Sequence, residues 1–234
     1  MSVVTYPDRT GIRAPTPVPV PWSGVDDTAA IDAALAKAGA GGCIEFMQGK
    51  TYMTRGGHEL LTGQRVFGNK ATVKKFAQAT SVLNTGVTYS AGAKTVDVAT
   101  PGNFKAGMWV TVTSPLSALT TEGLYYSDAT KYKQCKPARV LSVAGNTVTV
   151  DRTMDIISGG SFTLSAANGA LLVENGPIFF SGKAWADYGS FAWATLPTAV
   201  EIYDLTIDGD RLNNTEGAWW NVAAALELYA HHLV

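Results

Sequence analysis

The clearest helical pattern in the chain lies between residues 26 and 38, where Ile31, Ala34 and Leu35 fall on one face. Residue types that favour helix N-caps stand at its start, and glycines follow at positions 39, 41 and 42. The pattern therefore predicts a short amphipathic helix. Its apolar stripe is thin and rich in alanine, so the helix can lie closely over another surface.

After residue 42 the spacing of apolar residues changes from helical to strand-like. Short β-prone runs occur at 43–46, 51–54, 64–67 and 71–74. Glycine-containing linkers, several of them only a few residues long, separate these runs. Such linkers are too short to hold a crossover helix, so the pattern excludes both a doubly wound sheet and a barrel of βα units.

Residues 85–155 show a different pattern, in which apolar and polar residues alternate. The alternation is clear at 94–98 and 109–113, and the runs 139–143 and 147–150 flank an Ala-Gly-Asn turn sequence. We predict a small antiparallel β module at 85–155, inserted between strands of the parent fold.

From residue 156 onward the short-strand pattern returns. In one of these runs Ile202 and Leu205 have opposite parity, and a bend at residues 203–204 would turn both towards the interior. The offset of 26 residues between Ile202 and Leu228 lies within the period of roughly 20–50 residues expected of solenoid repeats. Together with the uncrossed strands after residue 42, this pattern favours a solenoid.

Composition narrows the possible partners of the chain. Its 234 residues are 46% hydrophobic, which is enough for a sizeable core, and its formal charge is -1. The balanced charge disfavours nucleic acid and an anionic membrane surface as partners. No apolar window is long enough to span a membrane, and no signal-peptide h-region follows Met1. The two cysteines, Cys43 and Cys135, favour buried free thiols, with a single disulfide as the alternative.

One stretch carries a family resemblance. Residues 24–34 contain the tripeptide Asp26-Asp27-Thr28, and Gly-Gly-Cys-Ile-Glu-Phe at 41–46 and Gly-Lys-Thr-Tyr at 49–52 follow in order. This arrangement resembles the opening of the pectate-lyase-like superfamily of right-handed parallel β-helices, particularly phage tailspikes and related depolymerases. The resemblance implies an all-β right-handed parallel β-helix whose N-terminal helix caps the first coil. Asp26, Asp27 and Thr28 are then structural cap residues, and catalytic carboxylates only as a remote alternative.

With this resemblance the chain divides into four segments. They are a Pro-rich extended N-terminal arm at 1–22, the capping helix and first coils at 23–84, the inserted module at 85–155, and further coils at 156–234. The family implies a homotrimer that joins a phage tail or baseplate protein through the arm, so that the protein is part of the virion. No terminal cap follows Leu233, and we expect the sequence to be the N-terminal part of a longer protein.

Acidic residues near the end of the chain are candidates for catalysis. Glycan hydrolysis needs two carboxyl groups about 5–10 Å apart on a groove, and Asp208, Asp210 and Glu216 are the nearby acidic set. The alternative is an ordinary turn, in which Asp-Gly-Asp is favoured for local reasons.

Aromatic residues stack well on sugar faces, but they also pack loops and subunit interfaces, and both interpretations stay open for Trp185, Trp193, Trp219 and Trp220. His58 stands alone in the sequence. His231 and His232 are adjacent in a predicted strand and therefore point to opposite faces, which removes them as a metal pair. We expect neither a metal nor a cofactor, since no phosphate loop, dinucleotide fingerprint or zinc spacing is present.

The leading hypothesis is the N-terminal part of a phage tailspike or tail-fibre protein, which attaches to the virion and binds host surface polysaccharide. Depolymerisation by a glycosidase or lyase reaction requires that coils beyond this chain carry the carboxylates. The first alternative is a non-enzymatic structural or adhesive tail protein. The second is a bacterial polysaccharide lyase or hydrolase, against which the absence of a recognisable signal peptide argues.

Overall fold

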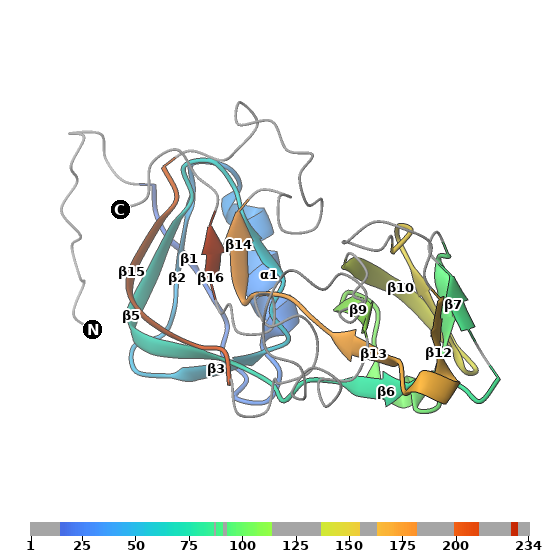
Figure 1. The fold of residues 1–234 in the computed structure, drawn as a ribbon. Helices are drawn as coiled ribbons and strands as arrows, with labels where there is room; N and C mark the ends of the chain where they lie inside the picture. The colour runs from blue at the N-terminus through green and yellow to red at the C-terminus, as the bar shows by residue number, and fades with distance from the viewer. Residues whose placement is uncertain are drawn as a thin grey trace, which may run out of the picture.

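The computed structural model describes residues 15–86, 88–90, 93–113, 137–154, 163–181, 199–210 and 226–228. Figure 1 shows two β parts beside each other. The parallel part comprises the described residues outside 77–176 and contains α1 (Thr28–Ala38). The antiparallel part comprises the described residues within 77–176. Each part has its own hydrophobic core, one around Tyr52 and the other around Leu172.

The strands of the parallel part are β1 (Val18–Pro19), β2 (Cys43–Glu45), β3 (Thr51–Thr54), β4 (His58–Leu60), β5 (Arg65–Lys75), β14 (Phe179–Ser181), β15 (Glu201–Asp208) and β16 (Leu226–Leu228). The first half of β5 pairs with β2 and its second half with β3, both in parallel. β15 pairs in parallel with β5, and a second parallel stack is formed by β4, β14 and β16, with β14 in the middle. Successive turns of the chain therefore lie on top of one another.

The register shows which residues repeat from turn to turn. Ile44, Val66 and Ile202 lie opposite one another in one stack of strands. Leu228 lies opposite Ser181 in the other stack. Ile202 and Leu228 therefore belong to different stacks. The prediction that the 26 residues between them form one repeat was wrong.

The bend predicted at residues 203–204 is confirmed. Asp204 has a φ of 49°, and the pairing of β15 with β5 shifts at this residue. β5 bends beside it, with positive φ at residues 69–70. A Cβ atom on Gly68 would stand only 2.3 Å from the Asp204 carbonyl oxygen, so this close approach of the two strands requires glycine.

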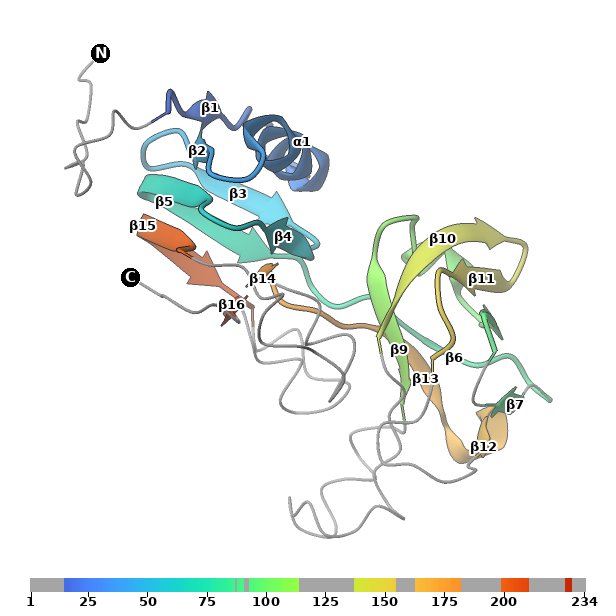
Figure 2. The ribbon, with the colours of Figure 1, turned by 90° about the horizontal axis from the view of Figure 1, so that it is seen from above.

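The predicted helix forms α1, and Figure 2 shows it with β1 at one end of the stacked strands. Its face of Ile31, Ala34 and Leu35 is buried in the core of the parallel part. Gln64 holds the C-terminal end of the helix by donating hydrogen bonds of 3.0 Å to the Leu35 carbonyl and 2.9 Å to the Gly39 carbonyl. Gln64 thereby satisfies two carbonyl groups at this end of the helix.

Residues 15–22 of the predicted arm lie along the first turn. β1 pairs in parallel with β2. The Tyr52 hydroxyl donates a 2.9 Å hydrogen bond to the Val20 carbonyl, and Trp22 Nε1 donates one of 2.9 Å to the Thr51 carbonyl. Residues 1–14 lie outside the described residues.

The antiparallel part contains β6 (Thr80–Val82), β7 (Thr88–Ser90), β8 (Thr95–Asp97), β9 (Trp109–Thr113), β10 (Ala138–Ala144), β11 (Thr147–Val150), β12 (Thr163–Ser165) and β13 (Leu171–Glu174), with short 3-10 turns at Pro101–Asn103 and Ala166–Asn168. Six strands form one sheet in the order β6-β13-β9-β10-β11-β8, and β12 pairs with β7. The hairpin predicted from the Ala-Gly-Asn sequence is the β10–β11 pair.

The antiparallel strands extend beyond the predicted limits of 85–155. The sequence analysis assigned β12 and β13 to further coils, but β12 pairs antiparallel with β7, and β13 pairs antiparallel with both β6 and β9. The chain enters the antiparallel part through β6 and leaves it through β13. These two strands pair with each other and so close the base of this part. Their short apolar runs look like solenoid strands in the sequence, because parity alone does not reveal the direction of the partner strand.

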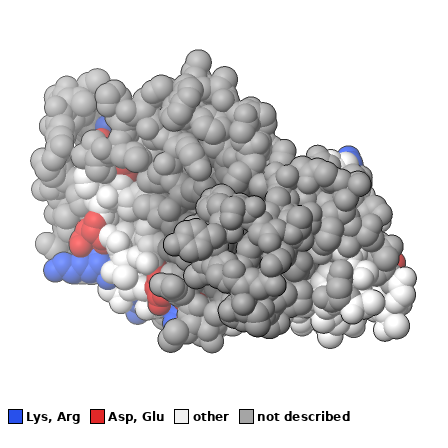
Figure 3. Space-filling model, in the orientation of Figure 1, with Lys and Arg blue, Asp and Glu red and all other residues white. Residues whose placement is uncertain are grey.

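The described residues are mostly strand, in agreement with the predicted all-β class, and the parallel strands curl around their core (Figure 1). Charged side chains of both signs gather on the parallel part at the lower left of Figure 3, whereas the described surface of the antiparallel part is mostly uncharged in that view. Among the described residues, no helix is both long and apolar enough to cross a membrane.

Candidate functional site

The structure places two predicted carboxylates together at the end of β15. Lys74 Nζ lies 3.5 Å from Asp208 Oδ2 and 3.7 Å from Asp210 Oδ1. The Asp210 amide donates a 2.9 Å hydrogen bond to Asp208 Oδ1, which is the local geometry of a turn. Both carboxylates therefore take part in one ion-pair cluster with Lys74.

The other predicted site residues, Glu216, Trp185, Trp193, Trp219 and Trp220, lie outside the described residues, as do Cys135, His231 and His232. Cys43 is buried, and burial raises the pKa of its thiol.

The two cap aspartates have different roles. Asp26 is exposed, and its Oδ1 accepts hydrogen bonds from the Thr28 amide (3.1 Å) and the Thr28 hydroxyl (2.7 Å). Asp27 is fully buried and turns away from the helix, accepting from the Ser23 amide (2.7 Å), the Ser23 hydroxyl (2.8 Å) and the Met53 amide (3.0 Å). Asp26 thus satisfies the helix start, and Asp27 ties it to β3.

His58, which stands alone in the sequence, has partners in the structure. Its Nδ1 lies 2.7 Å from Asp32 Oδ1 on α1, and its Nε2 lies 2.6 Å from the hydroxyl of Thr54 on β3. The Thr54 hydroxyl also accepts a 2.9 Å hydrogen bond from the Gly56 amide and lies 3.3 Å from the Thr28 hydroxyl, so it joins His58 to the start of the helix as well. The clue in the sequence is Asp32, an acidic residue one turn after Thr28 on the predicted helix.

An acid, a histidine and a hydroxyl in this order form the arrangement of a hydrolytic triad. However, Thr54 and His58 are both fully buried. A substrate carbonyl cannot reach the Thr54 oxygen, which is already bonded to Gly56 and His58. The chain Asp32–His58–Thr54 therefore serves to hold α1 on the first turn.

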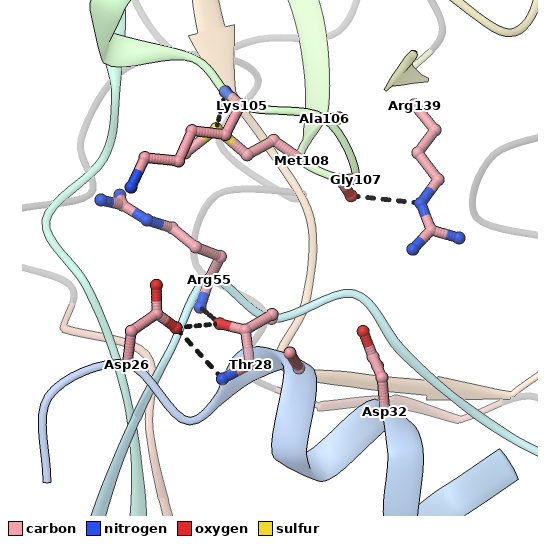
Figure 4. A pocket seen from close by; sticks show the side chains of 11 residues that line it. Asp26, Thr28, Asp32, Arg55, Lys105, Ala106, Gly107, Met108 and Arg139 are labelled. Atoms are coloured by element: carbon pink, nitrogen blue, oxygen red, sulfur yellow. Dashed lines mark hydrogen bonds between the residues drawn. The ribbon is translucent and has the colours of Figure 1, made fainter. Parts of the chain in front are cut away.

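A cleft of about 430 Å³ lies between α1 and the antiparallel part. Figure 4 shows Asp26 and Asp32 on the α1 side, and Lys105 and Arg139 on the opposite side. Arg55 reaches into the cleft from the turn after β3. Arg139 is held in place by a 3.2 Å hydrogen bond from its Nε to the Gly107 carbonyl. The volume falls within the range of about 300–1,000 Å³ that is usual for ligand pockets.

Asp26 and Asp32 bring negative charge to one wall of the cleft and Lys105 and Arg139 positive charge to the other, while Arg55 adds a cation from the parallel part. Within the described part of the chain, no ion pair joins Asp26 or Asp32 to Lys105 or Arg139. Carboxylates accept hydrogen bonds and the cations donate them. A hydroxyl group both donates and accepts, so a ligand rich in hydroxyl groups can bond to both walls at once. The same described residues contain no cluster of three His, Cys, Asp or Glu side chains that could hold a metal ion.

A cluster of polar side chains lies buried where the two parts join. Arg55 Nη1 pairs with Glu174 Oε2 at 3.1 Å, and Lys75 Nζ donates a 2.6 Å hydrogen bond to the Gly176 carbonyl. Burial lowers the pKa of the Lys75 ammonium and raises the pKa of the Glu174 carboxyl, although each charge favours the ionised form of the other. The burial of these polar groups was not predicted from the sequence.

No protein-family model matches the chain, and no curated protein is similar to it at a significant level. Three solved structures that align with it are phage tailspikes. The Gp54 tailspike of Acinetobacter baumannii bacteriophage AP22, solved in complex with A. baumannii capsular saccharide, is 13% identical over 89% of this chain and 33% of its own, with a TM-score of 0.31.

The tailspike protein gp49 from Pseudomonas phage LKA1 is 16% identical over 75% of this chain and 27% of its own. The tailspike gp61 from Pseudomonas phage phi297 is 14% identical over 76% of this chain and 31% of its own. Both have a TM-score of 0.31, so the likeness is loose. This chain spans about a third of the length of these tailspikes.

Proposed function

We propose that this chain is the N-terminal part of a phage tailspike or tail-fibre protein that attaches to the virion and binds host surface polysaccharide. The observation that carries the proposal is the covered beginning of the parallel part. α1 and β1 lie over one end of the stacked turns, in the chain order implied by the sequence resemblance. An uncovered first turn would expose a sheet edge and an apolar interior, so a solenoid needs such a lid.

In this proposal the parallel part is the start of a right-handed parallel β-helix, and the protein assembles as a homotrimer. The arm at residues 1–22 contacts a tail or baseplate protein. Its residues 15–22 lie along the first turn, at the end of the stack that α1 covers, which favours that end as the side facing the virion.

The cleft between α1 and the antiparallel part is the proposed contact for polysaccharide among the described residues. Sugar hydroxyl groups would accept from Lys105 and Arg139 and donate to Asp26 and Asp32, which face one another across the cleft. Because Lys105 and Arg139 project from the antiparallel part, that part would complete a site that the parallel part cannot form alone.

A non-enzymatic adhesive protein is the second candidate, and the state of the described carboxylates favours it. Asp208 and Asp210 share Lys74, and Glu201 pairs with Arg65 Nε at 3.0 Å. Each of these three carboxylates is engaged by a cation of the chain itself, so their placement gives no pair of carboxyl groups directed at a ligand. Cleavage of a glycan would therefore depend on residues other than these three.

The test is binding of the purified chain to immobilised bacterial capsular polysaccharides and O-antigens, measured by biolayer interferometry, together with its mass by light scattering. We expect a trimer that binds at least one polysaccharide, and a reducing-end assay separates adhesion from cleavage. Lys105→Ala should weaken binding, whereas Lys94→Ala, an exposed lysine outside the cleft, should not. A monomer that binds none of the polysaccharides would contradict the proposal.

A further inference from the structure

The charged side chains of the cleft differ in whether the chain already engages them. Arg55 Nη1 lies 3.1 Å from Oε2 of Glu174, a carboxylate that is only 2% exposed. Asp32 Oδ1 lies 2.7 Å from Nδ1 of the buried His58, although the Asp32 side chain remains 43% exposed. One cation and one carboxylate of the cleft are therefore held by groups that a ligand cannot reach.

The two cations of the antiparallel part are not engaged in this way. Lys105 and Arg139 are exposed and line the cleft, and no carboxylate of the residues that the structure describes forms an ion pair with either side chain. The remaining carboxylate, Asp26, already accepts two hydrogen bonds from Thr28 at its Oδ1. The charge that the cleft offers to a ligand is therefore mainly positive.

The main chain that carries the two cations is fixed before a ligand binds. Lys105 lies in the turn that leads into β9, and in this turn the Gly107 amide donates a 2.8 Å hydrogen bond to the Val140 carbonyl. The Val140 amide donates one of 2.8 Å to the Met108 carbonyl, so the turn is tied to β10. Arg139 precedes Val140 on β10, and its Nε donates to the Gly107 carbonyl at 3.2 Å. Such a preformed arrangement reduces the entropy that binding would cost.

We infer from this charge distribution that the cleft binds an acidic saccharide, in which a sugar carboxylate contacts Lys105 and Arg139. The inference rests on the proposed function, because it names the class of polysaccharide that the cleft selects. Guanidinium and ammonium groups donate charge-assisted hydrogen bonds to a carboxylate, and these are roughly twice as strong as hydrogen bonds between neutral groups. A neutral sugar forms only the weaker hydrogen bonds and leaves both cations without a counter-charge.

The opposite side of the cleft sets the orientation of the sugar. Asp26 and Asp32 lie there on the α1 side, facing Lys105 and Arg139 (Figure 4). A sugar carboxylate directed at the two aspartates meets like charge, whereas sugar hydroxyl groups can donate hydrogen bonds to them. The carboxylate of the sugar therefore faces the antiparallel part, and its hydroxyl groups face α1.

The test compares a polysaccharide that the full chain binds with the same polysaccharide after carboxyl reduction, which replaces each sugar carboxylate by a primary hydroxyl group. The probes are purified bacterial capsular polysaccharides and O-antigens, both acidic and neutral, and binding is measured by biolayer interferometry at low and high salt. We expect the bound polysaccharides to be acidic and carboxyl reduction to weaken binding by about tenfold or more. Added salt should weaken binding of the native form more than binding of the reduced form.

Two variants connect this effect to the cleft. Lys105→Gln and Arg139→Gln each remove one cation, and each should weaken binding of the native polysaccharide by about tenfold while changing binding of the reduced form much less. Lys94→Gln, which alters an exposed lysine outside the cleft, is the control and should bind both forms as the wild type does. Equal losses for the native and reduced forms would overturn the inference. Because both residues are exposed, we expect the melting temperatures to stay close to that of the wild type, and the comparison on the wild-type chain needs no variant.

The outcomes separate this inference from the proposed function. A chain that binds a neutral polysaccharide, or that binds an acidic one equally well after carboxyl reduction, would overturn the acidic class and leave polysaccharide binding intact. Binding that is lost when phosphate groups are removed, but not when carboxylates are reduced, would overturn the assignment of a carboxylate. Absence of binding to every polysaccharide would contradict the proposed function and this inference together.

Discussion

Replacing Asp27 by alanine tests how the helix is held on the first turn. The Asp27 carboxylate accepts three hydrogen bonds, and the Met53 amide among them lies at a partly buried site on β3. Leaving a buried donor unsatisfied costs about 1–3 kcal/mol, and the loss of an ordinary hydrogen bond to exposed Ser23 adds about 0.5–1.5 kcal/mol. We therefore expect Asp27→Ala to lower the free energy of unfolding by about 2–4 kcal/mol.

The matched control is Asp26→Ala, which removes the exposed aspartate next to it. That change removes two exposed hydrogen bonds to Thr28 and should cost about 1 kcal/mol. For a domain of this size each kcal/mol lowers the melting temperature by roughly 2–4 °C.

The assay is thermal unfolding by circular dichroism, combined with hydrogen exchange at the Met53 amide. Asp27→Ala should lower the melting temperature more than Asp26→Ala does, and should reduce the protection of the Met53 amide selectively. Equal melting temperatures for the two variants, or unchanged protection at Met53, would refute the reasoning that Asp27 ties the helix start to β3.

Two further predictions follow from close contacts and from buried charge. A Cβ atom on Gly42 would stand 2.1 Å from the Ala38 carbonyl oxygen, so Gly42→Ala should destabilise the chain by about 1–3 kcal/mol in urea unfolding, while Gly102→Ala, in open space, should not. Burial lowers the pKa of the Lys75 ammonium in the folded chain, so between that pKa and about 10.5 the unfolded state binds more protons and stability rises with pH. The substitution Lys75→Met should remove this rise, and an unchanged pH profile would contradict the prediction.

Local signals in the sequence were sufficient to predict individual helices, strands and turns. The helix, the short strands after residue 42, the β10–β11 hairpin and the bend at residue 204 each depend on neighbours within a few positions. Capping residue types, turn sequences and parity report such neighbours directly. The all-β class followed from the same signals.

Contacts between distant segments were not predictable in this way. β5 pairs with β15 across more than a hundred residues, and His58 finds Asp32 and Thr54 only when α1 lies on the first turn. The same holds for β13, whose apolar run fits either a solenoid strand or a member of an antiparallel sheet. The partner strand, and not the run itself, decides between these two structures.

The polar joint at Lys75 and Glu174 bears on how one turn of the parallel part can tolerate so large an insertion. β14 must return to the register set by β4, where Phe179 lies opposite His58, although the chain has first built a separate core. A joint of apolar residues would fix this return by packing alone. Buried polar groups are costly unless they are paired, so a charged joint is expected where position matters more than packing energy. Here Arg55 pairs with Glu174 and Lys75 donates to the Gly176 carbonyl, so two polar contacts hold the returning chain beside the strand from which it left.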